Sequence, residues 1–194
     1  MSYHIYTTDG IILKRTNFGE ANVLIYVLTQ ELGLIIASAR SARLSVSKLG
    51  SSLQEYSLVT VSCVKGKGGW KITNVSGKEN FFFEMGHISR SVMAAVVSLV
   101  LQMIVGESPH PEIFNVIRDG LLYLKSVPDE DTSYVESLLV FRILYQLGYV
   151  GRSSETENFL TNQNLWNESL LQEMQIKKPI VIGAINKALQ ESQL

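Results

Sequence analysis

Residues 56–75 read YSLVTVSCVKGKGGWKITNV and predict a β-hairpin. Two runs rich in valine, isoleucine and threonine, residues 56–64 and 70–75, flank a glycine-rich segment at residues 65–69. β-Branched residues favour the extended backbone, and glycines supply the backbone conformations that a tight turn requires. This hairpin indicates that the surrounding sequence forms β-structure.

Three further apolar runs precede the hairpin, and residues typical of turns separate them. We expect strands at residues 10–14, 23–29 and 34–39, and a longer connection over residues 40–55. Five short strands in about 80 residues, with one long connection after the third, are typical of a small closed barrel of the OB type. The sequence therefore predicts an OB-fold five-stranded β-barrel.

The apolar spacing becomes helical from residue 87 onward. Residues 91–106 carry no charge and are mostly apolar. This stretch is shorter than the roughly 20 residues that a membrane span needs, so it predicts a helix at the centre of a bundle. Further helices are expected at residues 110–124, 132–147, 164–174 and 179–189. We therefore predict an α+β multidomain chain, with an OB-fold domain at residues 1–80 and an α-helical domain at residues 81–194.

Charge differs between the two predicted domains. Residues 1–80 hold nine basic and five acidic residues, whereas residues 81–194 hold eight basic and thirteen acidic ones. Such asymmetry indicates different partners for the two halves, because binding depends on the local field and not on net charge.

The small number of cysteines and the spacing of the histidines limit which disulfides and metal sites the chain can form. Cys63 is the only cysteine, which excludes an intrachain disulfide and a cysteine-based zinc site. The histidines His4, His87 and His110 are far apart in sequence, so no metal and no cofactor are expected. The N-terminal residues lack the basic and apolar regions of a signal peptide. We expect a cytoplasmic protein.

No catalytic motif emerges from the sequence. The glycines at residues 66–69 lack the Lys-Ser/Thr ending of a phosphate-binding P-loop. The acidic run at residues 129–131 precedes a predicted helix, where a solvated loop that favours the helix N-terminus is the simplest interpretation. The chain is therefore predicted not to be an enzyme.

Positive charge is the feature that carries chemistry. Between residues 40 and 71, Glu55 is the only acid, and the basic residues are Arg40, Arg43, Lys48, Lys65, Lys67 and Lys71. OB-fold barrels bind single strands in a groove where basic residues follow the phosphates and aromatic residues stack on bases. We predict these six residues as DNA-binding. In the alternative interpretation they only solvate a loop, and Tyr56 and Trp70 belong to the core. Because Trp70 alternates with Lys71, we expect Trp70 to face the core.

Several segments resemble the RecO family of recombination mediators. They are Asp9-Gly10-Ile11-Ile12-Leu13, Gly19-Glu20, the run LTQELGL at residues 28–34, Ala39-Arg40-Ser41-Ala42-Arg43, Ser47-Lys48-Leu49 and the glycine-rich hairpin. The resemblance covers some 70 residues, in order and at the family's spacing. In the second half, residues 138–149 resemble the family's segment before its zinc-binding loop. Residues 151–154 replace the four-cysteine module, so the chain resembles a short form without zinc.

The resemblance implies a nucleoid-associated DNA repair protein. Family members bind single- and double-stranded DNA, anneal complementary strands, and act with RecR and the single-stranded DNA-binding protein to load RecA. An alternative function is a protein–protein adaptor with weak DNA affinity, whose helical domain receives the acidic tail of the single-stranded DNA-binding protein. The central basic residues of that half, Arg118, Lys125 and Arg142, are the candidates for such a contact.

Overall fold

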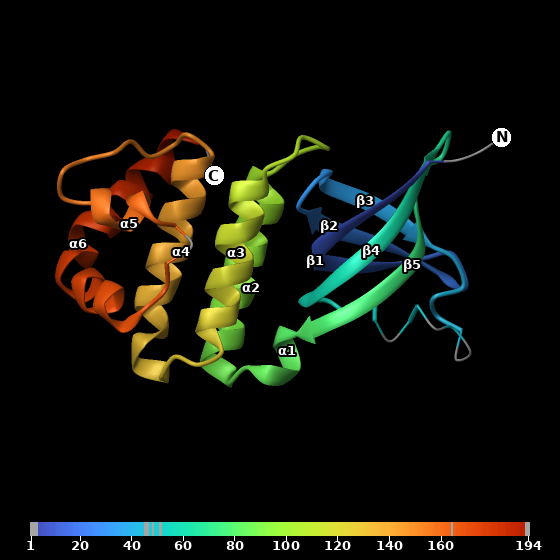
Figure 1. Ribbon diagram of the computed structural model, residues 1–194, viewed down its shortest axis with the longest axis horizontal. Helices are drawn as coiled ribbons and strands as arrows, with labels where there is room; N and C mark the ends of the chain where they lie inside the picture. Colours follow the sequence, from blue (N-terminus) through green and yellow to red (C-terminus); the bar gives the residue numbers. More distant parts are fainter. Residues whose placement is uncertain (1–3, 45–46, 48, 51, 164, 193–194) are drawn as a thin grey trace. The chain divides into compact units, whose positions relative to one another are not determined.

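The computed structural model describes residues 4–44, 47, 49–50, 52–163 and 165–192 (Figure 1). They group into two compact units, each of which combines two stretches of the chain. Unit 1 contains Met1–Glu84 and Met103–Phe114, and unit 2 contains Met85–Gln102 and Asn115–Leu194. The domain division at residue 80 stays a prediction.

Five strands of unit 1 form a closed barrel in the order β1-β2-β3-β5-β4. They are β1 (Ile5–Phe18), β2 (Asn22–Thr29), β3 (Gly33–Ala39), β4 (Ser57–Gly66) and β5 (Gly69–Asn80). β1 pairs antiparallel with both β2 and β4, and a short parallel pairing of β3 with β5 closes the ring. This topology confirms the predicted OB-fold five-stranded barrel and the α+β class.

Two strands are longer than the sequence predicts. β1 extends beyond residues 10–14 at both ends, and β5 continues past residue 75 to Asn80. The extensions are mostly exposed and lack apolar alternation, so periodicity does not reveal them. The extension of β5 is stabilised by pairing with β4, which runs from Gly66↔Gly69 to Ser57↔Asn80.

Alternate residues of the strands fill the barrel. The core of unit 1 includes Ile12, Val23, Ile25, Val27, Ile35, Ala37, Val59, Val61, Cys63, Trp70 and Ile72. Trp70 is only 6% exposed, which confirms its expected place in the core. Some side chains that alternate with this set are buried as well, namely Ile11, Leu13, Leu28, Leu34 and Leu58. Others, namely Leu24, Tyr26, Ile36 and Lys71, are at least partly exposed on the outside of the barrel.

Six α-helices are assigned in the described chain. They are α1 (Phe81–Glu84), α2 (His87–Met103), α3 (Pro111–Leu124), α4 (Thr132–Gln146), α5 (Glu157–Thr161) and α6 (Glu168–Glu191). The stretch at residues 91–106 forms most of α2, as expected. Within the described residues, no helix combines the length and apolarity needed to cross a membrane.

The expectation of two separate helices at residues 164–174 and 179–189 is wrong. α6 runs unbroken from Glu168 to Glu191 and contains Pro179 in its interior. A proline removes one helical hydrogen bond and normally ends or kinks a helix. Here Met174 and Val181 are both fully buried, so packing on each side of Pro179 keeps the two segments in one helix.

Candidate nucleic-acid interface

The strand register places a cation beside an aromatic ring on the outside of the barrel. Lys14 of β1 lies opposite Tyr26 of β2, and Tyr26 lies opposite Ile36 of β3. Side chains directly opposite on one sheet face lie about 5 Å apart. The Lys14 Nζ lies 5.8 Å from the centroid of the Tyr26 ring, and Ile36 is 49% exposed. This row combines a charge, an aromatic face and an apolar surface.

A second row runs parallel to the first. Thr16 of β1 lies opposite Leu24 of β2, Leu24 lies opposite Ser38 of β3, and Ser38 pairs with Lys71 of β5. Lys71 therefore ends this row on the side of β5. We call the two rows together the outer face: Lys14, Thr16, Leu24, Tyr26, Ile36, Ser38 and Lys71. It has an apolar centre with a lysine on either side.

Arg40 and Arg43 lie at the edge of the outer face, just after β3. Arg43 N–H donates to the carbonyl of Ala21 at 3.0 Å, and Arg43 Nη1 donates to the carbonyl of Gly19 at 3.2 Å. These bonds hold the arginine segment against the turn between β1 and β2. Both arginine side chains are exposed, so their charge reaches solvent at this edge.

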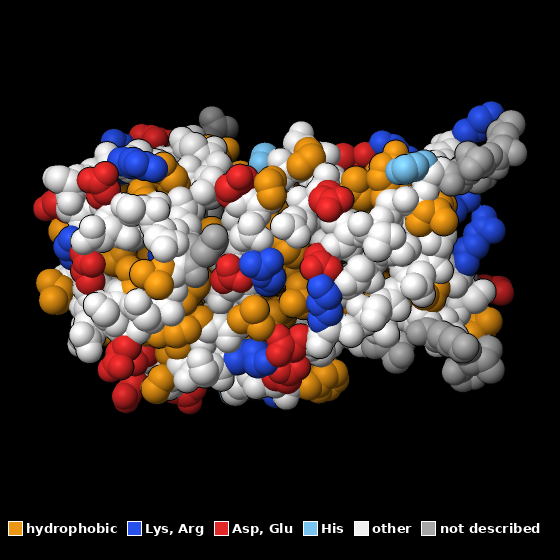
Figure 2. All heavy atoms as spheres, in the orientation of Figure 1, with side chains coloured by type: hydrophobic (Ala, Val, Ile, Leu, Met, Phe, Trp, Pro, Cys, Tyr) orange, Lys and Arg blue, Asp and Glu red, His pale blue; other side chains and the backbone are white. Residues whose placement is uncertain are grey.

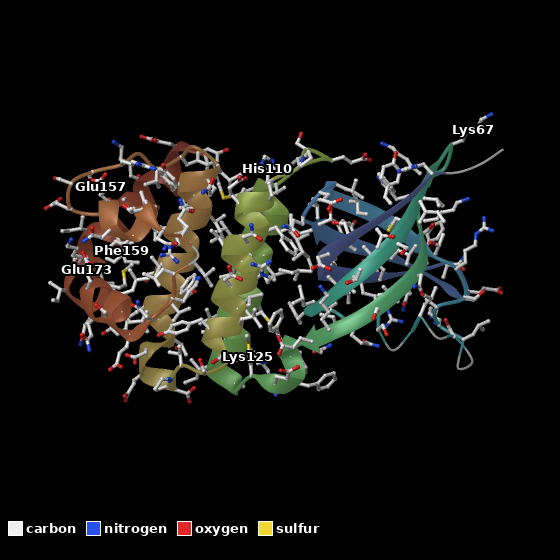
Figure 3. The ribbon with its side chains drawn as sticks, viewed as in Figure 1. Lys67, His110, Lys125, Glu157, Phe159 and Glu173 are labelled. Atoms are coloured by element: carbon white, nitrogen blue, oxygen red, sulfur yellow. The ribbon has the colours of Figure 1, made fainter. Side chains whose placement is uncertain are left out.

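The hairpin lysines have different surroundings. Lys67 lies at the tip of the β4–β5 hairpin and points away from the barrel (Figure 3). Lys65 Nζ instead donates to Glu107 Oε2 at 2.5 Å and lies 5.4 Å from the centroid of the Trp70 ring. Lys48 lies outside the described residues. The structure thus brings Arg40, Arg43 and Lys71 to one end of β3.

Most basic side chains on and around the outer face are not paired with an acidic side chain among the described residues. Lys78, elsewhere on β5, is paired with Asp9 at 2.6 Å. In contrast, Lys14, Arg40, Lys67 and Lys71 form no ion pair within 4 Å among the residues that the structure describes. Figure 2 shows basic side chains along the margin of the barrel. A polyanion therefore meets cations that are not already neutralised by a neighbouring acid.

Sequence reasoning missed the centre of the outer face. Lys14, Leu24 and Tyr26 are not among the predicted DNA-binding residues. That prediction follows the excess of basic residues between residues 40 and 71, whereas these three residues lie in β1 and β2. The sequence of β2 is apolar from Val23 to Leu28 and does not show which side chains point outward, whereas the burial pattern of the strand does. Leu24 and Tyr26 lie between the buried residues Val23, Ile25 and Val27, so their side chains point outward.

The basic candidates of the helical half do not form one site. Arg118 of α3 donates through Nε to Asp119 at 2.8 Å, and Lys125 follows directly after α3 (Figure 3). Arg142 is fully buried. The expectation that Arg142 offers charge to a partner is therefore corrected, because a buried guanidinium cannot flank a peptide groove.

The chain itself uses the Arg142 guanidinium. It donates to the backbone carbonyls of Phe159, Asn162, Gln163 and Leu165 at 2.8–3.3 Å. The guanidinium also lies 4.6 Å from the centroid of the Trp166 ring. Burial lowers the pKa of Arg142 to about 10. Arg142 thus fixes the irregular segment between α5 and α6.

Unit 2 has a groove on another surface. Residues of α4, of the segment after α4 and of α6 line a cavity of about 240 Å³. Its apolar lining includes Phe141, Tyr149, Val150 and Ile180, and Lys187 lies among the lining residues. Glu191 also lines the cavity, and its Oε1 lies 3.9 Å from the Lys187 Nζ, so the groove is apolar with one exposed ion pair among its lining residues.

Possible metal ligands do not gather in the described part of the chain. No group of three or more histidine, cysteine, aspartate or glutamate side chains has the arrangement to hold an ion there. Burial raises the pKa of the Cys63 thiol to about 11, and Cys63 lies in the barrel core.

A closed barrel in this strand order, with a cationic and aromatic outer face and helices after it, defines an OB-fold protein with a helical region. Residues 1–97 match the family described as "Recombination protein O N terminal". The chain belongs to the RecO family.

Several curated bacterial proteins named "DNA repair protein RecO" are similar to this chain. That of Dehalococcoides mccartyi is 30% identical over 158 residues, which cover 80% of this chain and 61% of the relative. That of Rubrobacter xylanophilus is 25% identical over 76% of this chain and 59% of the relative. That of Syntrophobacter fumaroxidans is 29% identical over 74% and 57%, respectively. The chain thus spans about three fifths of the length of these curated relatives.

Proposed function

We propose that this protein is a DNA repair protein that binds single- and double-stranded DNA on the outer face of its barrel. The observation that carries the proposal is the pair of rows across β1, β2, β3 and β5, with Lys14 and Lys71 on either side of Tyr26 and Ile36. Arg40, Arg43 and Lys67 extend the positive charge along the edge. The names of the relatives support a role in DNA repair.

Each part of the outer face has a physical role in DNA binding. The lysines and arginines neutralise phosphates and release counterions, which makes the affinity fall steeply with salt. Tyr26 offers a ring surface for a base, and this contact tolerates any sequence. In double-stranded DNA the faces of the bases are stacked on one another and cannot contact Tyr26, so the same cations bind its phosphates. Binding is therefore expected for both forms of DNA, with preference for the single strand.

We further propose that the protein acts as a non-catalytic recombination mediator. A surface that screens two strands and holds each loosely raises the rate at which complementary strands meet, without ATP. The family resemblance supports partnership with RecR, with the single-stranded DNA-binding protein and, indirectly, with RecA. Lys48 stays a proposed DNA contact on the same resemblance.

Charge reversal at the edge of the outer face tests this function. Arg40→Glu combined with Arg43→Glu is expected to weaken binding of an oligothymidine strand by more than tenfold and to slow strand annealing. The dependence of log Kd on log salt should become less steep, because fewer phosphates are neutralised. Arg152→Glu combined with Lys187→Glu is the control, since it changes net charge equally at exposed positions of unit 2. Equal effects of the two double variants would contradict the site.

A second candidate function is an adaptor that binds an acidic protein tail with little DNA affinity. The groove of unit 2 supports it, because Tyr149 and Ile180 line an apolar surface and an acidic tail can compete with Glu191 for the exposed Lys187, whose Nζ lies 3.9 Å from Glu191 Oε1. A titration with the C-terminal peptide of the single-stranded DNA-binding protein tests this function. Lys187→Glu should abolish peptide binding, whereas the Arg40 and Arg43 reversals should not affect it. Peptide binding without any DNA retardation would favour the adaptor.

A further inference from the structure

A second concave surface of unit 1 lies beside the outer face. Its lining residues come from β1, from the segment before β4, from the end of β5 and from α1, and they are Arg15, Gln54, Glu55, Tyr56, Asn80, Phe82 and Phe83. The cavity measures about 410 Å³. Three of the seven lining residues are aromatic.

The aromatic rings present flat surfaces to solvent. Phe83 is 74% exposed and Phe82 is 41% exposed. The rings of Tyr56 and Phe82 are nearly parallel, with an interplanar angle of 15° and a centroid distance of 6.3 Å. The Phe83 ring stands at 90° to Phe82, at 5.6 Å between centroids. Exposed rings in a hollow are costly to hydrate and gain free energy when another ring stacks on them.

The backbone keeps these rings in place. Tyr56 has a φ of 64°, in the left-handed region that a tyrosine rarely adopts. Its N–H donates to the carbonyl of Ile12 at 2.8 Å, and its carbonyl accepts from the N–H of Phe81 at 3.1 Å. Asn80 Oδ1 accepts the N–H groups of Phe82 and Phe83. The pocket is therefore preorganised, which lowers the entropy lost on binding.

Polar groups beside the rings fit a nucleotide. Arg15 carries the charge and the N–H donors that bind a phosphate. Gln54 Nε2 donates to the carbonyl of Gly50 at 3.0 Å, which leaves the side-chain oxygen of Gln54 to accept from the amino and imino groups of a base. Glu55 Oε1 accepts the backbone N–H of Arg15 at 2.8 Å, so Glu55 holds the strand at this pocket. Arg15 lies between Lys14 and Thr16 in β1, and its side chain points to the opposite side of the strand from theirs. The pocket is therefore a surface of its own, separate from the outer face.

We propose that this pocket binds one unpaired nucleobase of single-stranded DNA, which stacks on Phe83 while Arg15 contacts its phosphate. The proposal rests on the proposed DNA-binding function and adds to it a subsite that distinguishes strands. A paired base cannot leave its duplex without losing its stacking and pairing, so the pocket favours the single strand. The outer face alone provides only charge and one ring for this distinction.

Phe83→Ala in the full chain tests the pocket. It should weaken binding of an oligothymidine strand by about tenfold, the usual effect of removing one stacking ring, and leave binding of a duplex within about twofold. Phe83→Trp keeps a ring and should retain the wild-type affinity. Ile176→Ala is the matched control, because Ile176 is an 80% exposed apolar residue of α6. A strand with a single 2-aminopurine should lose fluorescence on binding the wild type and lose less on binding Phe83→Ala.

Two results would overturn the pocket while the proposed function stands. One is wild-type affinity of Phe83→Ala for the single strand, which would assign the aromatic pocket to a protein partner. The other is an equal loss for single strand and duplex, which would mean that Phe83 acts only through the fold. A wild-type chain that binds neither form of DNA would instead remove the proposed function and the pocket together.

Discussion

The Nζ atom of Lys65 lies 2.5 Å from Oε2 of Glu107, a residue of the segment that joins α2 to α3. The hydrogen bond from Lys65 lowers the pKa of Glu107. Under the proposed DNA-binding function, the Glu107 carboxylate competes with a DNA phosphate for Lys65. Both side chains are about half exposed, so DNA can compete for the lysine.

Glu107→Gln is therefore expected to strengthen DNA binding. The substitution removes a negative charge and leaves Lys65 available, while an exposed ion pair stabilises the fold by at most about 1 kcal/mol. Affinity for an oligothymidine strand should rise about threefold, and the slope of log Kd against log salt should steepen by nearly one unit. Fluorescence anisotropy over a salt series measures both quantities. Glu112→Gln, at another exposed acid of unit 1, is the control. Equal gains in the two variants would indicate a general charge effect.

Arg142→Met should destabilise the protein without changing DNA affinity. Four backbone carbonyls lose their donor, and the Trp166 ring loses the guanidinium that lies 4.6 Å away. We expect the free energy of unfolding to fall by about 3 kcal/mol. Arg142→Lys should recover little, because one ammonium group cannot reach all four carbonyls. Arg152→Met is the control, because Arg152 is exposed and its Nε donates only to the Tyr145 hydroxyl, so its replacement should cost far less stability. Urea denaturation measures these differences, and equal losses at positions 142 and 152 would contradict the structural role.

Arg142 also shows why charge in a sequence does not define a surface. Leu138, Leu139 and Ile143 are buried in α4, and Arg142, which directly precedes Ile143, is buried with them. Sequence alone could not show that carbonyls of residues 159–165 converge on it, since that segment is irregular and 17 or more residues away. Helical periodicity locates α4, but only the tertiary fold identifies what its arginine contacts.

The barrel was predictable because its five apolar runs alternate and are separated by turn residues. The outer face was only partly predictable. Arg40, Arg43 and Lys71 are recognisable in the sequence as a cluster of positive charge. Lys14 and Tyr26 are recognised as part of the site only because the β1–β2 register places them opposite each other. The aromatic pocket was not predictable, because Tyr56 and Phe83 are far apart in sequence and a backbone hydrogen bond from Phe81 to Tyr56 brings them together.

Gly33→Ala is expected to destabilise unit 1 far more than Gly19→Ala. Both glycines have a positive φ, 73° and 60° respectively, so alanine strains the backbone at either position by about 1 kcal/mol. At Gly33 a Cβ would also lie within van der Waals overlap of the Ser108 carbonyl, whereas at Gly19 nothing lies within 4 Å. The loss at Gly33 should exceed the loss at Gly19 by about 2 kcal/mol or more in urea denaturation. Equal losses would mean that the segment around Ser108 does not pack on the turn between β2 and β3.

Alkaline pH should destabilise the barrel through Cys63. Burial raises the pKa of this thiol from 9.0 to about 11, so the unfolded chain releases the proton at lower pH than the folded chain does. The stabilising contribution is complete below pH 9 and disappears as the pH rises towards 11. Cys63→Ala should therefore lose less stability than the wild type between pH 9 and 11, by about 2 kcal/mol. Tyrosine ionisation affects both proteins equally and cancels in the comparison. Parallel stability curves for the two proteins, or rapid alkylation of native Cys63 by iodoacetamide at pH 8, would contradict the burial of this thiol in the barrel core.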